Sequence, residues 1–316
     1  MRHEIKFAVV REDAELEAEL VRIVGAREAL VVASGGCTAL TLCRLYPSLR
    51  VTAFDLSVSQ LEHLVLKADA AERGDLAALN VGTDDDCGLN QRGAFEGLFR
   101  LLRGFLIEFV TGREELESFF LGSAEARAAL LPGWQRTPYW AAAFRTAFCD
   151  PFLGAMFGPA ATQHAAPGSY GLYFEQAFSR GLAAPEAHAN PFLQHVLLGR
   201  YLEPPAYARG GPLPSRPALV EGSLLEVSDL ARFDVVSLSN VFDWSDDALC
   251  ARWGRVLARQ MRPGSAILLR QLNNERSLRP FFDQHFRFDD PLARALAQRD
   301  RSLFYNRFEI AFREAS

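Results

Sequence analysis

The chain contains 316 residues, of which 49% are hydrophobic and 23% charged, a composition that is ordinary for a soluble globular protein. Its formal net charge of −5 disfavours a broad nucleic-acid surface, and no apolar run approaches the ~20 residues of a membrane span, so we expect a cytoplasmic protein. The five cysteines are scattered without a C-x-x-C pair and the six histidines are dispersed, so neither a disulfide framework nor a metal site is expected.

The first ninety residues alternate between helical and strand patterns. Glu12–Gly25 is amphipathic and predicts a helix, and the apolar run Ala29–Ser34 ends in a glycine pair, which is typical of a buried parallel strand. This order of strand, glycine loop, helix, strand and acid predicts a βαβ unit, and Ser57, with Gln60 at the third helical position, is expected to cap its last helix. The helix, strand and helix that follow the glycine pair are expected at Thr38–Tyr46, Arg50–Phe54 and Ser57–Arg73.

A long segment of mostly helical pattern follows. Thirteen of the 24 phenylalanines lie between Gln91 and Arg200, and Phe95–Phe109 places aromatic and leucine side chains at helical spacing. Helix packing explains such stripes, and the alternative is that they enclose an apolar pocket or touch a membrane surface. Further helices are expected within Trp134–Phe157, Tyr170–Ala183 and Asn190–Tyr201.

The strand pattern resumes near Ala218 and completes the predicted sheet. Alternating strands and helices at this spacing predict the α/β class, with a Rossmann-like, doubly wound sheet in two halves, residues 1–90 and 204–316, and a large helical insertion at residues 91–203. Phe286–Phe288 and Ser302–Phe312 predict a final antiparallel strand pair. The other elements expected here are strands at Pro217–Glu221, Phe233–Ser239 and Ser265–Arg270 and a helix at Asp246–Met261.

Glycine and polar residues follow the predicted strands and indicate a nucleoside site. Glycine lets a ligand approach the backbone, a helix N-terminus offers free N–H groups, and a carboxylate at the end of the second strand can accept both ribose hydroxyls. A dinucleotide loop would carry G-x-G-x-x-G, but the third glycine is missing, so the pattern favours an S-adenosylmethionine fold. The remaining alternative is a glycine turn with Asp55 as a helix cap. The expected ligand-binding residues are Ser34, Gly35, Gly36, Cys37, Asp55, Gly222, Ser223, Ser239 and Asn240.

A set of segments spread in order over nearly the whole chain carries a family resemblance. These segments are Val31–Leu40, Phe54–Ser57, Gln60–Leu61, Leu66–Lys67, Gly88–Glu96, Tyr173–Glu175, Asn190–Leu193, Gly199–Tyr201 and Leu238–Trp244. Together they resemble the S-adenosylmethionine:diacylglycerol 3-amino-3-carboxypropyltransferases, the first enzymes of betaine-lipid synthesis, and their uncharacterised bacterial relatives. Phe7–Asp13 is more similar to the relatives than to the lipid enzymes.

The resemblance implies an unusual use of S-adenosylmethionine, in which the four-carbon amino-acid arm is transferred instead of the methyl group. The acceptor is an alcohol or an amine, either a lipid such as diacylglycerol or a small molecule, and methylthioadenosine leaves. The resemblance adds Leu56 and Gln60 to the cofactor side, and Arg11 and Arg270 are candidates for the carboxylate of the arm because arginine binds carboxylates bidentately.

An alcohol acceptor needs a general base, and the acceptor itself needs partners. The candidates for the catalytic groups are Asp243, Glu175, Tyr173 and His195, and the resemblance implies that Asn190, Arg200 and Tyr201, with Tyr173, line the acceptor side. The alternatives are a helix cap for Asp243, a core residue for His195 and surface positions for Arg11 and Arg270. At the level of function, the alternatives are an ordinary methyltransferase and a protein that binds the cofactor without turnover, and peripheral membrane contact is a further expectation.

Overall fold

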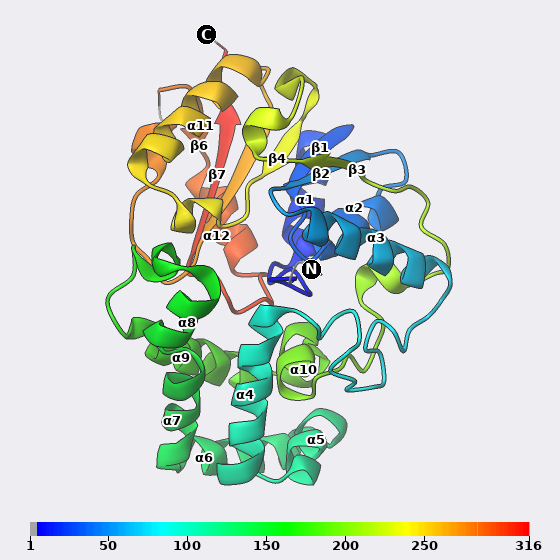
Figure 1. Ribbon diagram of the computed structural model, residues 1–316, viewed down its shortest axis with the longest axis vertical. Coiled ribbons are helices and arrows are strands. Elements are labelled where there is room, and N and C mark those ends of the chain that lie inside the picture. The colour runs from blue at the N-terminus through cyan, green and yellow to red at the C-terminus, as the bar shows by residue number, and fades with distance from the viewer. Residues whose placement is uncertain (1–4, 283, 316) are drawn as a thin grey trace.

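One mixed sheet organises the described part of the chain, residues 5–282 and 284–315 of a computed structural model (Figure 1). The strands lie in the order β3-β2-β1-β4-β5-β7-β6. The first five of these pair in parallel, and β7 runs antiparallel to both β5 and β6. Their bounds are β1 Glu28–Val32, β2 Arg50–Asp55, β3 Ala218–Glu221, β4 Val235–Ser237, β5 Ala266–Gln271, β6 Phe286–Phe288 and β7 Arg307–Arg313.

Helices cover both faces of this sheet. In β1, Val31 packs into the core that holds α1, α2, α3 and α12, whereas its neighbour Leu30 packs into the core that holds α11. This alternation is the period of two expected for a strand that is buried on both faces. The fold is therefore α/β with a mostly parallel sheet, as predicted, and is compatible with a Rossmann-like fold. The covering helices are α1 Ala14–Val24, α2 Cys37–Leu45, α3 Val58–Glu72, α11 Asp247–Gln260 and α12 Asp290–Ala297.

The predicted antiparallel strand pair is confirmed, but its second strand begins later than expected. Strand β7 starts at Arg307, and the residues just before it form a loop. Phe304 in this loop is buried in the core of the helical insertion and therefore does not pair with β5. The sequence pattern could not distinguish a strand residue from a loop residue buried in the helical insertion, because both place an apolar side chain in a core.

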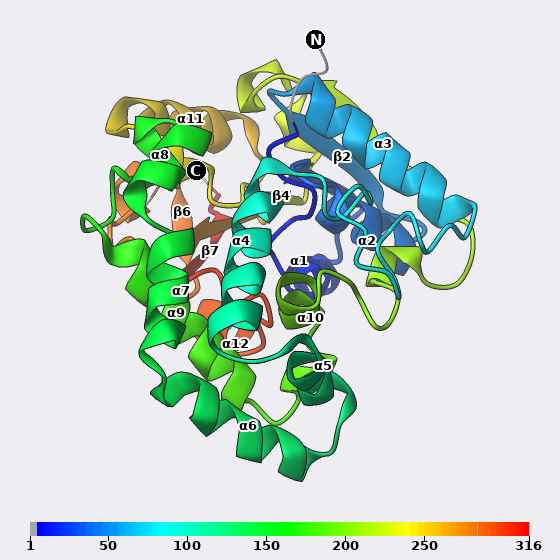
Figure 2. The same ribbon diagram turned by 60° about the horizontal axis from the view of Figure 1, so that its bottom comes forward.

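Helices α4–α10 pack together at one end of the sheet (Figure 1, Figure 2). Their bounds are α4 Ala94–Phe109, α5 Arg113–Leu121, α6 Ala124–Arg136, α7 Pro138–Ala147, α8 Asp150–Phe157, α9 Ser169–Ala183 and α10 Pro191–Leu197. Helix packing accounts for most of the thirteen phenylalanines between Gln91 and Arg200, since eight of their rings are buried in one core. They are Phe95, Phe99, Phe119, Phe120, Phe144, Phe148, Phe174 and Phe178.

Candidate functional site

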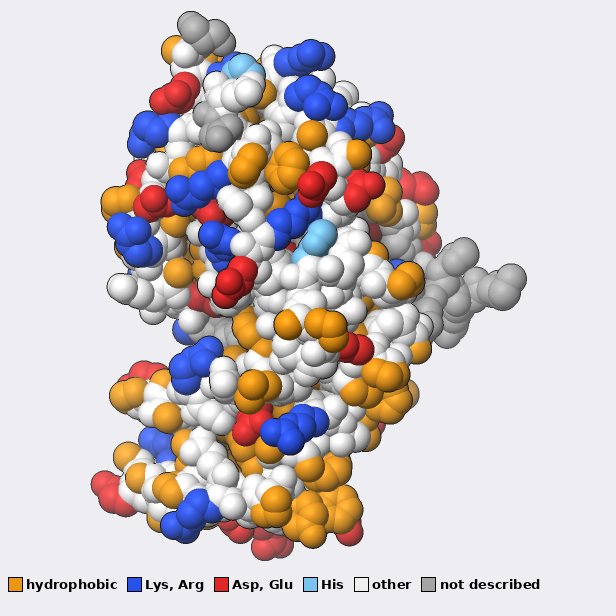
Figure 3. Space-filling model, turned by 90° about the vertical axis from the view of Figure 1, so that its left-hand side faces the viewer, with side chains coloured by type: hydrophobic (Ala, Val, Ile, Leu, Met, Phe, Trp, Pro, Cys, Tyr) orange, Lys and Arg blue, Asp and Glu red, His pale blue; other side chains and the backbone are white. Residues whose placement is uncertain are grey.

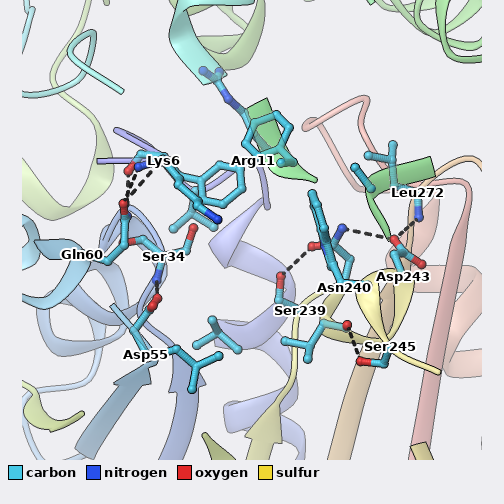
Figure 4. A pocket seen from close by; sticks show the side chains of 18 of the residues that line it. Lys6, Arg11, Ser34, Asp55, Gln60, Ser239, Asn240, Asp243, Ser245 and Leu272 are labelled. Atoms are coloured by element: carbon cyan, nitrogen blue, oxygen red, sulfur yellow. Dashed lines mark hydrogen bonds between the residues drawn. The ribbon is translucent and has the colours of Figure 1, made fainter. Parts of the chain in front are cut away.

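A cavity of about 630 Å³ lies at the carboxyl ends of β1, β2, β3 and β4 (Figure 4). In a parallel sheet these ends meet at one edge, where ligands bind in open α/β folds. Residues 6–12, which we call the crossing segment, form a second wall, and helices α4, α8 and α9 with the loop 302–306 form a third. The cavity is therefore enclosed by the sheet, the crossing segment and the helical insertion together.

Asp55 ends β2 with its carboxylate held at the cavity wall. Oδ2 accepts from the backbone N–H of Ser34 at 2.9 Å, and Oδ1 accepts from that of Ser57 at 2.9 Å. Burial raises the pKa of Asp55, and the two backbone N–H groups oppose that rise. Each carboxylate oxygen thus keeps acceptor capacity for a ligand hydroxyl. Leu56 next to it also lines the cavity and is 78% exposed.

The glycine loop after β1 is covered by the protein itself. A Cβ on Gly35 would lie 2.5 Å from the Cα of Val9, so the crossing segment occupies the space above the loop. The Lys67 ammonium binds the same loop, donating to Gly35 O at 2.8 Å and to Cys37 Sγ at 3.0 Å. Gly35, Gly36 and Cys37, which were expected to face the ligand, do not line the cavity, whereas Ser34 does.

Gln60 fastens the crossing segment and does not cap its own helix. Its Oε1 accepts from the backbone N–H groups of Lys6 at 2.9 Å and Phe7 at 3.3 Å, and its Nε2 donates to Phe7 O and Ser34 O. Ser57 stands at the N-cap position of α3 without a side-chain hydrogen bond. The predicted capping arrangement is thus absent, because the Gln60 amide bonds to segments far away in the sequence.

Further buried side chains hold Ala8 at the middle of the crossing segment. His63 Nε2 lies 2.9 Å from Ala8 O, and burial lowers the pKa of His63 to about 3, so this imidazole is neutral and donates to the carbonyl. Glu96 accepts from the Ala8 N–H at 2.8 Å and forms an ion pair with Arg11 at 2.7 Å. The crossing segment is therefore a fixed wall that presents Arg11 and Glu12 to the cavity.

A row of polar side chains follows β4 along the cavity. The Ser239 hydroxyl donates to Glu12 and lies 3.3 Å from the Asn240 amide oxygen, and Asn240 Nδ2 donates to Asp243 Oδ2 at 3.1 Å. All four residues line the cavity. The row therefore places two carboxyl groups, Glu12 and Asp243, on either side of a hydroxyl and an amide, and Figure 4 shows its members Ser239, Asn240 and Asp243.

Asp243 is a buried carboxyl group with three hydrogen-bond donors. Leu272 N–H donates to Oδ2 at 2.8 Å and Asn274 Nδ2 donates to Oδ1 at 2.5 Å, in addition to Asn240. Burial raises the pKa of Asp243 to about 7, although these donors act in the opposite direction. A carboxyl group whose pKa lies near neutrality is suited to accept and return a proton.

Arg270 lies in a buried charge cluster and does not face the cavity. Its guanidinium binds both oxygens of Glu17, at 2.5 and 2.9 Å, and lies 3.4 Å from Glu12. Arg270 is therefore not positioned to bind a ligand carboxylate as expected, because Glu17 already occupies that face and Arg270 is absent from the cavity lining. Burial, with the nearby Glu17 charge, raises the pKa of Glu12 to about 7 although Arg270 lowers it.

His195 and five other residues expected at the acceptor side or in catalysis lie outside the cavity. Tyr173 donates to Phe304 O at 2.6 Å, and Asn190 caps α10 and donates to Arg301 O. Glu175 on α9 has one buried carboxylate oxygen without a hydrogen-bond partner. The remaining two are Arg200, which pairs with Glu117 at 3.2 Å, and Tyr201, which is buried beside His195.

His195 is a core residue, which was the alternative to a catalytic role for this side chain. It is 1% exposed and its Nε2 lies 2.5 Å from Asn90 O, while its Nδ1 lies 3.0 Å from Arg11 Nη1. Burial lowers the pKa of His195, so the ring is neutral. Among the proposed bases, Asp243 is thus the one that lines the cavity.

Sequence reasoning missed Glu12 and most of the aromatic wall. Glu12 was assigned to a helix, and Tyr305 to a strand, so neither stood out as a ligand-facing residue. The signal that was available is the concentration of aromatic residues in segments that the sheet does not use. The aromatic residues lining the cavity are Phe7, Phe54, Phe95, Phe157, Tyr170, Phe174, Trp244, Trp253, Phe304 and Tyr305.

Exposed hydrophobic side chains occur on the outer surface of the helical insertion, and Figure 3 shows them gathered at the lower edge of one face. Two of these exposed side chains, Phe109 and Tyr139, stack with ring centroids 5.6 Å apart. Within residues 5–282 and 284–315, no helix is long and apolar enough to cross a bilayer. The exposed large hydrophobic residues of the insertion are Leu101, Phe109, Leu121, Tyr139, Phe152 and Leu172.

Comparison of the chain with models of protein families, with curated proteins and with solved structures finds no match. The geometry of the cavity and the sequence resemblance therefore carry the functional argument.

Proposed function

We propose that the protein is an S-adenosylmethionine-dependent transferase that moves the 3-amino-3-carboxypropyl group to an alcohol or amine acceptor. The observation that carries the proposal is a single cavity with Asp55 at the end of β2 and the carboxyl groups of Glu12 and Asp243 beside an aromatic wall. Asp55 suits a ribose diol, the carboxyl group of Glu12 suits a positive sulfonium, and Asp243 beside the aromatic wall suits a reacting acceptor.

The nucleoside end of the ligand fits the strand edge. The two fixed oxygens of Asp55 suit the ribose hydroxyls, and Gly222 and Ser223 follow the neighbouring strand β3 in the same wall. Apolar side chains, including Leu225 and Val241, continue this wall and suit a flat base. A strand order compatible with a Rossmann-like fold supports the same assignment.

The covered glycine loop argues against a dinucleotide. The diphosphate of a dinucleotide needs an open glycine loop and a free helix N-terminus, but the crossing segment fills the space above Gly35. The cavity also carries two carboxyl groups, Glu12 and Asp243, on the row after β4. Carboxylates repel a diphosphate and attract a sulfonium, so S-adenosylmethionine fits this site better.

The choice of the transferred group rests on the family resemblance. When the arm is transferred, an acceptor attacks the γ-carbon, the carbon–sulfur bond breaks and neutral methylthioadenosine leaves. The protein therefore needs to orient the acceptor, exclude water and hold one proton. Asp243 is placed to take that proton, and Arg11, whose guanidinium is paired with Glu96, is the arginine in the cavity wall nearest to this role for the carboxylate of the arm.

Product analysis tests this function. The full chain is incubated with S-adenosylmethionine and a panel of alcohols and amines, and the nucleoside products are separated by chromatography. We expect methylthioadenosine in an amount equal to the modified acceptor. Release of S-adenosylhomocysteine would identify a methyltransferase, and calorimetric binding without either product would identify a protein that binds the cofactor without turnover. Binding of neither S-adenosylmethionine nor methylthioadenosine would refute the proposal.

A further inference from the structure

The part of the cavity formed by the helical insertion is an apolar chamber with a carboxyl group at its edge. Its wall consists of side chains from α8, α9 and the loop 302–306, namely Leu153, Phe157, Tyr170, Phe174, Phe304 and Tyr305. Asp243 lies at the boundary between this chamber and the strand edge, with its own position fixed by three donors. A bound molecule in this chamber would therefore have an apolar body and meet one acid.

Asp243 has no cation of its own. Within the described residues, no Lys or Arg nitrogen lies within 4.0 Å of its carboxylate, and Arg276, whose charge reaches it, is paired with Asp247. A buried carboxylate that lacks a positive partner is costly to charge. A positively charged ligand group would remove that cost.

None of the cations that line the cavity, Lys6, Arg11 and Arg252, forms an ion pair with Asp243 in the described part of the chain. The guanidinium of Arg11 is paired with Glu96 at 2.7 Å. The charge of Lys6 acts on Asp55 at the nucleoside end, and that of Arg252 acts on Glu226, an exposed residue. None of these three cations pairs with the row that follows β4, in which Glu12 has Arg270 at 3.4 Å and Asp243 has no such partner among the described residues.

We propose, on the basis of the transferase function above, that the acceptor is an amine on an apolar or aromatic body and that Asp243 receives its ammonium group. Three donors occupy three of the roughly four acceptor positions of a carboxylate, so one remains for an N–H group. Aromatic residues line the same chamber, and aromatic faces attract cations, as they do in cages that bind ammonium groups. An alcohol would use the same acceptor position but leave the carboxylate charge unbalanced.

The reaction step balances with this acceptor. The ammonium group passes one proton to the Asp243 carboxylate, and the freed lone pair forms a carbon–nitrogen bond to the γ-carbon of the arm. The carbon–sulfur bond breaks, and its electron pair goes to sulfur, so methylthioadenosine leaves neutral. The second amine proton and the proton on Asp243 then pass to solvent as needed to restore the carboxylate. Glu12, the other carboxyl group of the row, remains for the positive groups of the donor.

Binding of a matched pair of probes tests the proposal. The full chain is saturated with methylthioadenosine and titrated by calorimetry with 2-phenylethylamine and with 2-phenylethanol, which differ in the charged group. We expect the amine to bind at least tenfold more tightly than the alcohol in the wild-type protein. Equal affinities, or no binding of the amine, would overturn the proposal. This comparison needs no variant, so it stands even if a substituted protein fails to fold.

Substitution then locates the effect. Asp243→Asn should remove most of the tenfold preference and leave methylthioadenosine binding within twofold, whereas Asp229→Asn, an exposed acid with a left-handed backbone that asparagine tolerates, should change neither. A preference that persists in Asp243→Asn would overturn the proposal. So would displacement of the amine by S-adenosylmethionine but not by methylthioadenosine, because the amine would then occupy the place of the donor's arm.

Turnover separates this inference from the function on which it rests. With S-adenosylmethionine as donor, we expect methylthioadenosine to form with the amine at a rate at least tenfold above that with the alcohol. Methylthioadenosine formation with the alcohol alone would refute the amine and leave the transferase function intact. Failure to bind either nucleoside would refute the transferase function itself.

Discussion

The backbone of Val9 lies directly against Gly35, so close that a Cβ on this glycine would be 2.5 Å from the Val9 Cα and carbonyl carbon. A glycine loop of the kind that approaches a ligand in other α/β proteins here approaches the protein's own chain. The contact positions the crossing segment, and with it Arg11 and Glu12, at the cavity.

Replacing Gly35 by alanine should therefore damage both stability and binding. The added Cβ meets backbone atoms that cannot rotate away, so we expect Gly35→Ala to lower the free energy of unfolding by about 1–3 kcal/mol in urea denaturation. Displacement of the crossing segment should also weaken methylthioadenosine binding. Gly104→Ala is the matched control, because Gly104 lies within α4 with open space around it and should gain up to about 1 kcal/mol. Equal stability of the two variants would contradict the contact.

Asp55 should contribute to nucleoside affinity through the ribose hydroxyls. We expect Asp55→Ala to weaken binding of S-adenosylmethionine and methylthioadenosine by about 1–3 kcal/mol, the scale of hydrogen bonds to a charged group. Removal of a ribose hydroxyl from methylthioadenosine should weaken binding to the wild-type protein but have little further effect on Asp55→Ala. Calorimetric titration of both ligands gives this cycle, and additive losses would place the ribose elsewhere.

Arg270 should act in stability and not in ligand recognition. Arg270→Ala would leave Glu17 buried without a positive partner, and we expect a loss of about 3–5 kcal/mol in the free energy of unfolding. Adding Glu17→Gln to Arg270→Ala should recover part of that loss, because the uncompensated charge disappears. Unfolding in urea measures all three proteins. A folded Arg270→Ala protein of wild-type stability with weakened ligand binding would contradict this assignment.

The raised pKa of Asp243 should make its contribution to stability depend on pH. Its pKa is about 7 in the folded protein and 3.8 as the ordinary value, so unfolding releases a proton between these values. The contribution is complete below about pH 4 and is lost as the pH rises to about 7, at up to about 1.4 kcal/mol per pH unit. The free energy of unfolding of the wild-type protein minus that of Asp243→Asn should therefore fall over this range. Parallel profiles for the two proteins would show that Asp243 titrates normally.

Periodicity was sufficient to predict most of the fold. A strand that is buried on both faces is apolar at consecutive positions such as Leu30 and Val31, and a helix that is buried on one face is apolar at helical spacing. These two patterns located the strands, the helices and the antiparallel pair of β6 and β7. Boundaries were less certain where a segment leaves one core for another, as at Phe304. Phe304 packs against the helical insertion, which is more than one hundred residues away in the chain, so no local pattern marks the start of β7.

The site could be predicted only where it follows directly from a strand. Asp55, Ser239, Asn240 and Asp243 line the cavity because strand ends carry them there. Arg270 also lies near a strand end, but it forms a buried ion pair with Glu17 of α1. No local sequence pattern indicates that partner. The residues assigned to the acceptor side by resemblance, Asn190, Arg200 and Tyr201, flank α10, whose position is set by packing.

The walls of the cavity come from segments that are far apart along the chain. Arg301, next to the loop that supplies Phe304 and Tyr305, is bound to Asp13, which follows the crossing segment, and these residues are 288 positions apart. Closing so long a loop is entropically costly, so these two segments meet late, after the local helices and neighbouring strands have formed. A ligand held by both segments would then act as a tether between distant parts of the chain and would raise the melting temperature with its concentration.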